Sequence, residues 1–457
     1  MSNKKQFDLT EGRILNRLLL ISLPIIGSNV FQMLYMFIDM FFLGRLSSDA
    51  VAASGTAGMY IWLSMALFLI GAMGAEIGVS QNLGAQKPEQ AKIFSQNATF
   101  LSLILGTLFS IILILFSNPL IGFFQIQEAH VAADAALYLR IFACGMPIMF
   151  VNASITSSFN GSGNSRLPFV IRSIVTVFNI IITPIFIFTL GWGIAGAALS
   201  TVVAQIVSFV ALMIAIKKHK QRPFEEYYYR DIFRWDYKVI KQIFKWAIPV
   251  SLESLCFTVF SMVITRYVTA FGAGALATQR VGSQIESLTW LVGGGFAAAF
   301  TSYVGQNFGA KKWDRIRSGF KVAAGIMTTY GVLITFVMFF GARFLFSLFI
   351  REPYIIEMGI EYLRLFAFVQ LITCVESLAA GAFRGVGKTK PPSINSIIFN
   401  GLRIPVAIGL SYTPLGLTGI WIGIVICAAL RGISLMIWYY VYNRKMVLQQ
   451  TSAELGV

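Results

Sequence analysis

The sequence predicts an all-α membrane protein that crosses the bilayer many times. Only 12% of its 457 residues are charged, against roughly a quarter in an ordinary soluble domain, and 56% are hydrophobic. The apolar residues form uncharged or nearly uncharged runs that are long enough to cross a hydrocarbon core of roughly 30 Å as helices. Membrane-spanning barrels need strands of about ten residues with alternating polarity, which these continuous runs do not resemble.

Twelve apolar runs follow one another along the chain. They cover residues 18–42, 51–80, 95–117, 135–158, 166–189, 193–216, 243–268, 276–303, 320–342, 358–382, 392–413 and 417–442. Lys and Arg gather in alternate connections, so we expect those connections and both termini to be cytoplasmic. The N-terminal segment lacks a short apolar region followed by a cleavage site, so the first run should remain in the protein. The sequence therefore predicts a multi-pass protein of the cell membrane.

The two halves of the chain resemble each other. Gln81-Asn82-Leu83-Gly84-Ala85 and Gln306-Asn307-Phe308-Gly309-Ala310 are 225 positions apart, as are Pro24 and Pro249. Each half has six runs, an even number, so both halves begin on the same side of the membrane. We therefore expect two six-helix lobes related by a pseudo-two-fold axis along the membrane normal.

The predicted domains follow from this repeat. The N-lobe should comprise residues 1–216 and the C-lobe residues 243–457. The connection at 217–242 is basic and aromatic, which is typical of an amphipathic segment at an anionic cytoplasmic leaflet. A nucleic-acid surface is the less favoured interpretation of the same residues, so no nucleic-acid partner is expected.

The residues that most enzymes require are scarce. The four cysteines lie in apolar runs without the spacing of metal ligands, and the two histidines are far apart. Gly387-Lys388-Thr389 resembles the end of a phosphate-binding loop, but Ala382 stands where that loop needs glycine. We therefore expect neither an enzyme nor a bound cofactor, and no metal site of the His or Cys kind.

Asp39 is the acid of the first apolar run. Gln32, Tyr35 and Asp39 are three and four positions apart, so they share one face of a helix. An ionised carboxylate within a membrane span is costly, and such residues usually bind ions, relay protons or line cavities. We predict an ion-binding role for Asp39. Contact with interfacial water at the end of the span is the alternative.

Further polar residues interrupt the later runs. Glu253 lies in the seventh run, Arg280 and Gln284 lie in the eighth, and Glu376 lies in the tenth. Together with Gln32 and Tyr35 they are the candidate substrate-binding residues. The alternative for Arg280 is that its side chain extends to the outer interface.

The repeat, the twelve runs, Leu23-Pro24 followed by Ile38-Asp39, and the paired Gln-Asn motifs resemble the multidrug and toxic compound extrusion (MATE) family. The resemblance implies two lobes that rock about a central cavity and export organic cations and other drugs against proton or sodium entry. It also implies that Asp39, Asn179 and Thr201 form the ion-coupling site of the N-lobe. Thr183 stands where one type of the motif has Asp, which leaves Asp39 as the sole acid.

The C-lobe departs from the sodium-coupled branch of that family. The acids of its seventh and tenth helices correspond here to Phe257 and Thr373, and Glu253 and Glu376 are each about one turn away. A second cation site in the C-lobe therefore stays open. Arg280 is similar to the eighth-helix arginine of DinF-like, proton-coupled members. The resemblance thus favours H+ as the coupling ion, with Na+ at the same acid as the alternative.

We therefore predict a cation-coupled antiporter that exports small organic, often cationic, compounds. Its partners should be the substrate and the lipid bilayer, and we expect a monomer. A lipid-linked saccharide flippase of the same superfamily is the alternative function. A non-transporting membrane receptor or channel is a further alternative.

Overall fold

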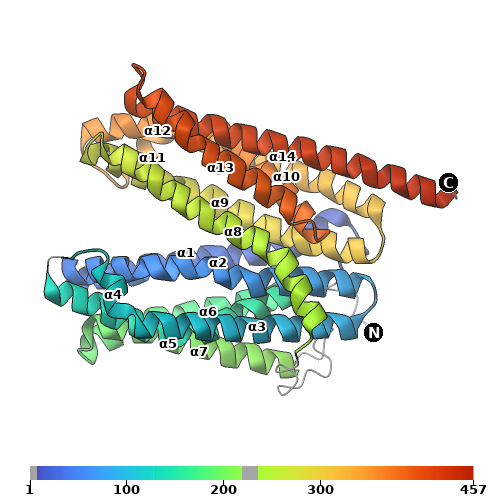
Figure 1. Ribbon diagram of the computed structural model, residues 1–457, viewed down its shortest axis with the longest axis horizontal. Helices are drawn as coiled ribbons and strands as arrows, with labels where there is room; N and C mark the ends of the chain where they lie inside the picture. Colours follow the sequence, from blue (N-terminus) through green and yellow to red (C-terminus); the bar gives the residue numbers. More distant parts are fainter. Residues whose placement is uncertain (1–7, 127, 219–234, 456–457) are drawn as a thin grey trace. The chain divides into compact units, whose positions relative to one another are not determined.

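The computed structural model describes residues 8–126, 128–218 and 235–455, and all regular structure within them is helical (Figure 1). The predicted all-α fold class is therefore confirmed. The first half contains α1 (Ile14–Leu46), α2 (Ser48–Gly84), α3 (Pro88–Leu115), α4 (Ser117–Gly122), α5 (Ala129–Gly161), α6 (Arg166–Pro184), η2 (Ile185–Thr189) and α7 (Gly193–Lys218). The second half contains α8 (Tyr237–Thr269), α9 (Ala273–Gly309), α10 (Trp313–Phe340), α11 (Ala342–Ser347), α12 (Pro353–Gly385), α13 (Lys390–Ser411) and α14 (Gly416–Leu455).

The helix lengths repeat from one half to the other. The first three helices have 33, 37 and 28 residues in both halves. A six-residue helix follows in each half, and then a helix of 33 residues. The short helices begin at Ser117 and Ala342, which are again 225 positions apart. The repeat found in the sequence is therefore a repeat of the fold.

All twelve predicted spans lie in long helices, but the helices differ in polarity. Eleven of those in the described residues are long and apolar enough to cross a membrane. The exception is α9, which has the length of a span but carries Gln279, Arg280, Gln284 and Glu286 in its first half. Glu286 is buried, so α9 directs part of this polar surface toward other helices.

Packing divides the chain into two compact units. The first unit consists of Met1–Ser251 with Ser302–Trp313, and the second consists of Leu252–Thr301 with Asp314–Val457. Most of the linker predicted at 217–242 lies outside the described residues. The lobes predicted at 1–216 and 243–457 stay a prediction from the repeat, whereas the two units are defined by which backbone segments pack together.

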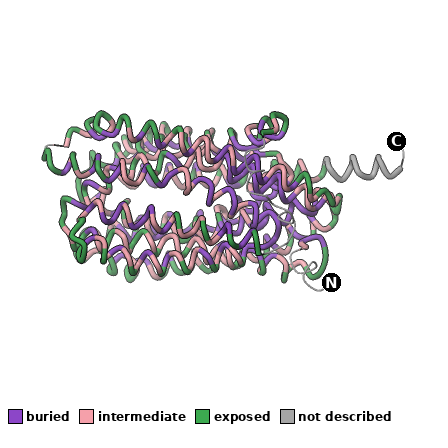
Figure 2. The backbone as a smooth tube through the Cα atoms, turned by 90° about the horizontal axis from the view of Figure 1, so that it is seen from below, coloured by how far each residue is buried: buried purple, intermediate pink, exposed green. Residues whose placement is uncertain are grey.

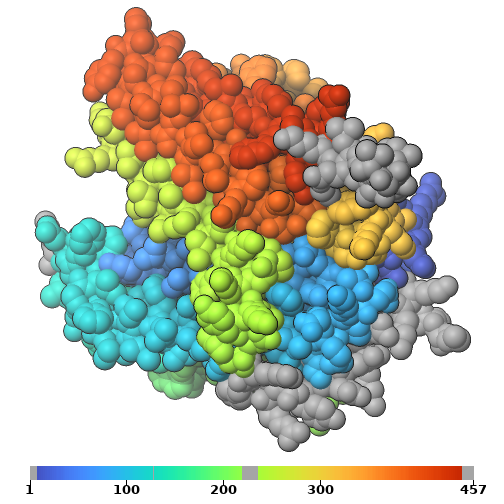
Figure 3. Space-filling view, turned by 45° about the vertical axis from the view of Figure 1, so that its right-hand side comes forward, coloured from blue at the N-terminus to red at the C-terminus, as the bar shows by residue number. Residues whose placement is uncertain are grey.

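The beginning of α8 belongs to the first unit because of its apolar side chains. Ile243, Ala247 and Val250 are buried in one cluster with residues of α2 and α3, among them Ile70 and Leu101. Figure 3 shows this part of α8, in yellow-green, lying against the blue surface of the preceding helices. Because lipid tails are as apolar as these side chains, van der Waals packing rather than exclusion from water holds such a contact between membrane helices.

The end of α9 also packs in the first unit, and it requires glycine. A Cβ atom on Gly84 would lie 1.9 Å from the Gln306 carbonyl oxygen, and one on Gly309 would lie 1.9 Å from the Gln81 carbonyl oxygen. The backbones of α2 and α9 therefore approach too closely for any side chain at these two positions. This contact explains why both copies of the Gln-Asn motif contain glycine.

Within the first unit, α5 packs against α2, α3 and α7, while α1 packs against α6. In the second unit, α14 packs against α12 and α13. Buried and exposed residues alternate along the helices (Figure 2), as expected when one face packs on neighbouring helices and another faces lipid. These contacts bring α1, α6 and α7 together around the polar residues predicted from the sequence.

Candidate functional site

A polar network in the first unit connects α1 with α7. Tyr35 lies one turn before Asp39 on the same face of α1, and its hydroxyl is 2.5 Å from Thr201 Oγ1. Thr201 Oγ1 is also placed to donate to the Ala197 carbonyl oxygen at 3.3 Å. A hydroxyl has a single proton to donate, so when Thr201 donates to Ala197 the Tyr35 hydroxyl is the donor toward Thr201.

The network continues from α7 to α6. The Thr183 hydroxyl lies 3.0 Å from Ser200 Oγ and 3.3 Å from Asn179 Oδ1. Ser200 precedes Thr201 on α7, and all four of these side chains are buried. Thr183, the residue that replaces an acid of the family motif, is therefore a neutral member of the network.

Asp39 is the acid on the same face of α1 as Tyr35, and one of its oxygens has no hydrogen-bond partner among the described residues. Asp39 Oδ1 is buried and accepts no hydrogen bond from any residue that the structure describes. Asn179 Nδ2 is likewise buried and donates none. A buried acceptor without a donor costs about 1–3 kcal/mol or more when it is charged, so such an atom is typical of a binding site rather than of packing.

Tyr138 of α5 completes the surroundings of Asp39. It is 5% exposed, stacks on Phe142 with ring centroids 6.3 Å apart, and interacts electrostatically with Asp39 and Tyr35. The sequence repeat singles out the segment around Tyr138, but nothing in the sequence connects it with Asp39.

Gln32 lies two turns before Asp39 and contacts a different helix. Arg172 Nη1 of α6 donates a hydrogen bond of 2.5 Å to Gln32 Oε1. Gln32 therefore lies beside the Arg172 cation. The position of Gln32 on the α1 face did not predict this contact.

In the second unit, the predicted substrate residue Glu376 forms an ion pair. Arg431 of α14 binds it in a bidentate manner, with Nε 2.7 Å from Oε1 and Nη2 3.0 Å from Oε2. Arg431 Nη1 also donates to Asn400 Oδ1 at 3.1 Å. Glu376 is 8% exposed, so this pair is a buried link between α12, α13 and α14.

Glu253 is also paired. Ser393 Oγ donates to Glu253 Oε2 at 2.8 Å, and Arg384 Nη2 lies 3.6 Å from the same oxygen. The side chains of Glu253 and Arg384 are about one-fifth exposed. This ion pair links α8 with α12 and α13 at the start of the second unit.

Arg280 and Gln284 differ from these buried acids. The Arg280 side chain is exposed and Gln284 is half-buried within the unit that contains them. Two residues after Gln284 on α9, however, Glu286 Oε1 accepts a hydrogen bond of 2.5 Å from the Tyr362 hydroxyl. Both Glu286 and Tyr362 are buried.

A small enclosed cavity lies next to Glu286. Its volume is about 40 Å³, enough for about one water molecule, and Gln370 and Arg403 are among its lining residues. Arg403 Nη2 donates to Ser261 Oγ at 2.7 Å, and its guanidinium lies 5.2 Å from the Phe257 ring centroid. The Phe257 ring thus lies next to a cation.

Sequence reasoning did not select four of these charged residues as site residues: Glu76, Arg172, Glu286 and Arg431. Their common signal is a charge within an apolar run, the criterion that selected Asp39. Glu76 is buried and accepts a hydrogen bond of 3.0 Å from Ser302. Applied to every run, the criterion would have found all four charges but not their partners.

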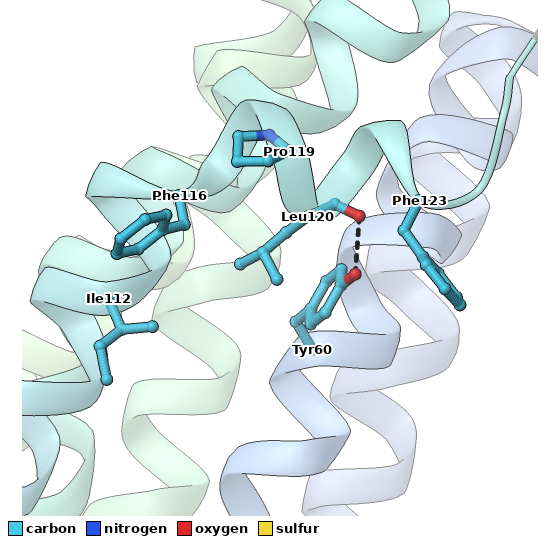
Figure 4. A pocket seen from close by; sticks show the side chains of 6 residues that line it. All are labelled: Tyr60, Ile112, Phe116, Pro119, Leu120 and Phe123. Atoms are coloured by element: carbon cyan, nitrogen blue, oxygen red, sulfur yellow. Dashed lines mark hydrogen bonds between the residues drawn. The ribbon is translucent and has the colours of Figure 1, made fainter.

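A separate groove near the ends of α2 and α3 is apolar. It has a volume of about 460 Å³ and is lined by Tyr60, Ile112, Phe116, Pro119, Leu120 and Phe123 (Figure 4). The Tyr60 hydroxyl donates to the Leu120 carbonyl oxygen at 2.6 Å. The groove thus offers no unpaired polar group to a substrate, and we do not include it in the site.

Comparison with known proteins gives the family and the fold. The family model described as MatE matches residues 24–185 and 249–408, one stretch in each half of the repeat. The chain is 28% identical over 425 residues to the "Probable multidrug resistance protein NorM" of Thermotoga maritima, covering 90% of this chain and 89% of that protein. It is 27% identical over 440 residues to the "Probable multidrug resistance protein YoeA" of Bacillus subtilis, covering 93% of each.

A solved structure shares the fold. The "Crystal structure of MATE in the bent conformation" superposes with a TM-score of 0.90 at 24% identity, covering 98% of this chain and 99% of that one. At this identity the similarity shows the arrangement of helices. The chemistry of the site rests on the residues described above.

Proposed function

The chain belongs to the MatE family, and from this premise we propose that it is a drug efflux antiporter of the cell membrane, with Asp39 as the group that couples export to cation entry. The observation that carries this proposal is the buried, unpaired Oδ1 of Asp39. In a bundle whose other buried acids have hydrogen-bond partners, this oxygen is the one placed to take up a cation.

Protonation of Asp39 would change the network around it. The ionised carboxylate can only accept hydrogen bonds, whereas the protonated carboxyl can also donate one. Tyr35, Thr201 and Asn179 would exchange partners when the charge disappears, so α1, α6 and α7 can adopt a second packing. We infer that this repacking drives the rocking of the two lobes that releases substrate outward.

The proton is favoured over sodium as the coupling ion. Asp39 is the sole acid of this network, because Thr183 and Ser200 supply only hydroxyl groups. One carboxylate suffices for a proton, whereas a sodium ion needs several oxygen ligands arranged around it. The membrane potential assists either ion by about 2.3 kcal/mol per charge per 100 mV.

Contacts with the substrate would come from polar side chains that are not held in ion pairs. Gln32 and Tyr35 lie beside the ion network, and Arg280 and Gln284 are accessible. Glu253 and Glu376 are occupied by arginines and would act as structural neighbours of the substrate unless their ion pairs open. We further propose that the protein works as a monomer with cytoplasmic termini.

A lipid-linked saccharide flippase is the second candidate. It would need cationic groups for a diphosphate, and Arg172 and Arg403 have no ion pair among the described residues. Buried acids on other helices, namely Glu76, Glu286 and Glu376, make the overall charge mixed, which favours the drug antiporter. Flipping of a fluorescent lipid-linked saccharide by the reconstituted protein, without dye transport, would support this second candidate.

The test is dye uptake into proteoliposomes that contain the full chain. We expect uptake when the interior is acidic, no response to a sodium gradient alone, and loss of uptake in Asp39→Asn. Asp49→Asn is the matched control, because Asp49 is an exposed acid that pairs with His130 at 2.9 Å. Wild-type rates in Asp39→Asn under both gradients would exclude Asp39 as the coupling residue.

A further inference from the structure

We propose that Arg172 and Gln32 form a subsite that binds the carboxylate of a transported substrate. This inference rests on the proposed export function and specifies its substrate class. Carboxylate-bearing amphiphiles, including zwitterions, should be transported in preference to purely cationic compounds of the same shape.

The first observation is that Arg172 lacks an acidic partner. Its guanidinium has five N–H groups, and the one hydrogen bond it makes to a described residue is that from Nη1 to Gln32 Oε1 at 2.5 Å. Arg431, by comparison, uses the same fork on both oxygens of Glu376 and on Asn400. Arg172 therefore keeps donors available for a ligand with two acceptor oxygens.

The second observation is the position of the guanidinium. Arg172 is half-buried, and its guanidinium lies against Gln32 where α6 packs on α1. A cation in an apolar span is costly unless it is paired or faces a water-filled opening. An accessible arginine without an acid in this position is therefore best explained by an opening that admits a charged ligand.

The surrounding residues suit an amphiphile. Phe169 lies one turn before Arg172 on α6, and its ring packs edge-on against Phe31, the neighbour of Gln32 on α1, with centroids 5.9 Å apart. An apolar body can contact these rings while its carboxylate meets the guanidinium. The planar arginine fork matches the two oxygens of a carboxylate, which lysine cannot reproduce.

The distance between Gln32 and the coupling residue Asp39 adds a constraint on the length of the substrate. Gln32 and Asp39 are seven residues apart on one helix face, which corresponds to about 10 Å along the axis. A zwitterion with its carboxylate at Arg172 and its cationic group about 10 Å away would reach Asp39. Protonation of Asp39 would then remove one of the two attractions and weaken the binding of such a substrate.

Two dyes that differ by one ester provide the test. Rhodamine 110 carries a free carboxyl group, whereas rhodamine 123 is its methyl ester and is purely cationic. Wild-type proteoliposomes should take up rhodamine 110 with the lower KM. Arg172→Met should raise the KM for rhodamine 110 about tenfold or more, the size expected for one charge-assisted hydrogen-bonded pair, and change that for rhodamine 123 less than about threefold.

Two further variants complete the design. Arg172→Lys should give an intermediate KM for rhodamine 110, because it keeps the charge and loses the fork. The Arg172→Lys variant also allows the KM values of the two dyes to be compared if Arg172→Met fails to fold. Arg166→Met is the control, because Arg166 is an exposed arginine at the start of the same helix.

The outcomes separate this inference from the proposed function. Equal KM values for the two dyes in the wild type, or an equal loss of both in Arg172→Met, would overturn the carboxylate subsite while leaving the antiporter intact. Failure of the wild type to take up either dye under any gradient would reject the export function itself, and the subsite with it.

Discussion

The two units share one pattern of helices but treat their buried acids differently. In the first unit, Asp39 leaves a carboxylate oxygen without a hydrogen bond. In the second unit, Glu376 is held by Arg431 and Glu286 by Tyr362. The comparison teaches that a charge within a membrane span has two physical outcomes. A paired acid fixes neighbouring helices, and an unpaired one is free to exchange a cation.

The sequence repeat shows which residues of the second half occupy the positions equivalent to the Asp39 network. Applying the offset of 225 places Ile264 opposite Asp39 and Phe260 opposite Tyr35. From α5 and α12 onward, which begin at Ala129 and Pro353, the offset is 224, and it places Arg403 opposite Asn179. The second copy has therefore lost the acid and gained a cation on an equivalent helical scaffold. The following variants test the distinction, in order of decreasing effect on stability.

Arg431→Met should have the largest effect. Removing one partner of a buried ion pair leaves the other charge uncompensated, so we expect the free energy of unfolding to fall by about 3–5 kcal/mol. Thermal unfolding in detergent micelles measures this change. Adding Glu376→Gln should restore most of the lost stability, and an Arg431→Met protein as stable as the wild type would show that the pair has no structural role.

Tyr362→Phe should have an intermediate effect. The substitution removes the hydroxyl that donates to Glu286 and leaves a buried carboxylate oxygen without that donor, at a cost of about 1–3 kcal/mol. Tyr354→Phe is the control on the same helix, because Tyr354 is exposed. An equal response to both substitutions would mean that Glu286 does not depend on Tyr362.

Tyr35→Phe should destabilise less. Thr201 keeps its hydrogen bond to Ala197 when the tyrosine hydroxyl is removed, so we expect a loss of about 0.5–1.5 kcal/mol. Transport under an acid-inside gradient should slow, because the network that responds to Asp39 is interrupted. Unchanged transport with the expected small loss of stability would remove Tyr35 from the coupling network.

Asp39→Asn should have the smallest effect on stability and the largest effect on transport. The amide replaces a carboxylate that has an unpaired buried oxygen, so the free energy of unfolding should change by less than about 1 kcal/mol. Coupled uptake should fall to background in the same preparation. A loss of stability as large as that of Arg431→Met would indicate a structural partner for Asp39. It would contradict the distinction between an unpaired acid in the first unit and paired acids in the second.

The fold was predictable from the sequence to a large extent. All twelve apolar runs lie in helices, and the offset between the halves recurs in the helix boundaries. Hydrophobic runs specify membrane helices because unpaired backbone groups cannot remain in hydrocarbon, which makes each span a local property of its own residues. The length of each helix beyond its apolar run was not predictable, because polar residues extend the helices past the run.

The site was predictable only in part. Asp39, Tyr35 and Gln32 were found because a helix places them on one face, and Thr201 was implied by the resemblance. The spacing of residues along the sequence did not predict which buried charges have partners. Glu376 meets Arg431 across 55 positions, and Arg172 meets Gln32 across 140.

By itself the sequence determined that this chain is a duplicated bundle of membrane helices with an acid in its first span. These properties depend on local hydrophobicity and on a repeated order of residues. Only the tertiary structure decided that, among the described residues, Asp39 keeps an unpaired oxygen, Glu376 does not, and Arg172 has no acidic partner. Charges within helices find partners only when distant helix faces pack together, and that packing determines which of them stay available to bind an ion or a substrate.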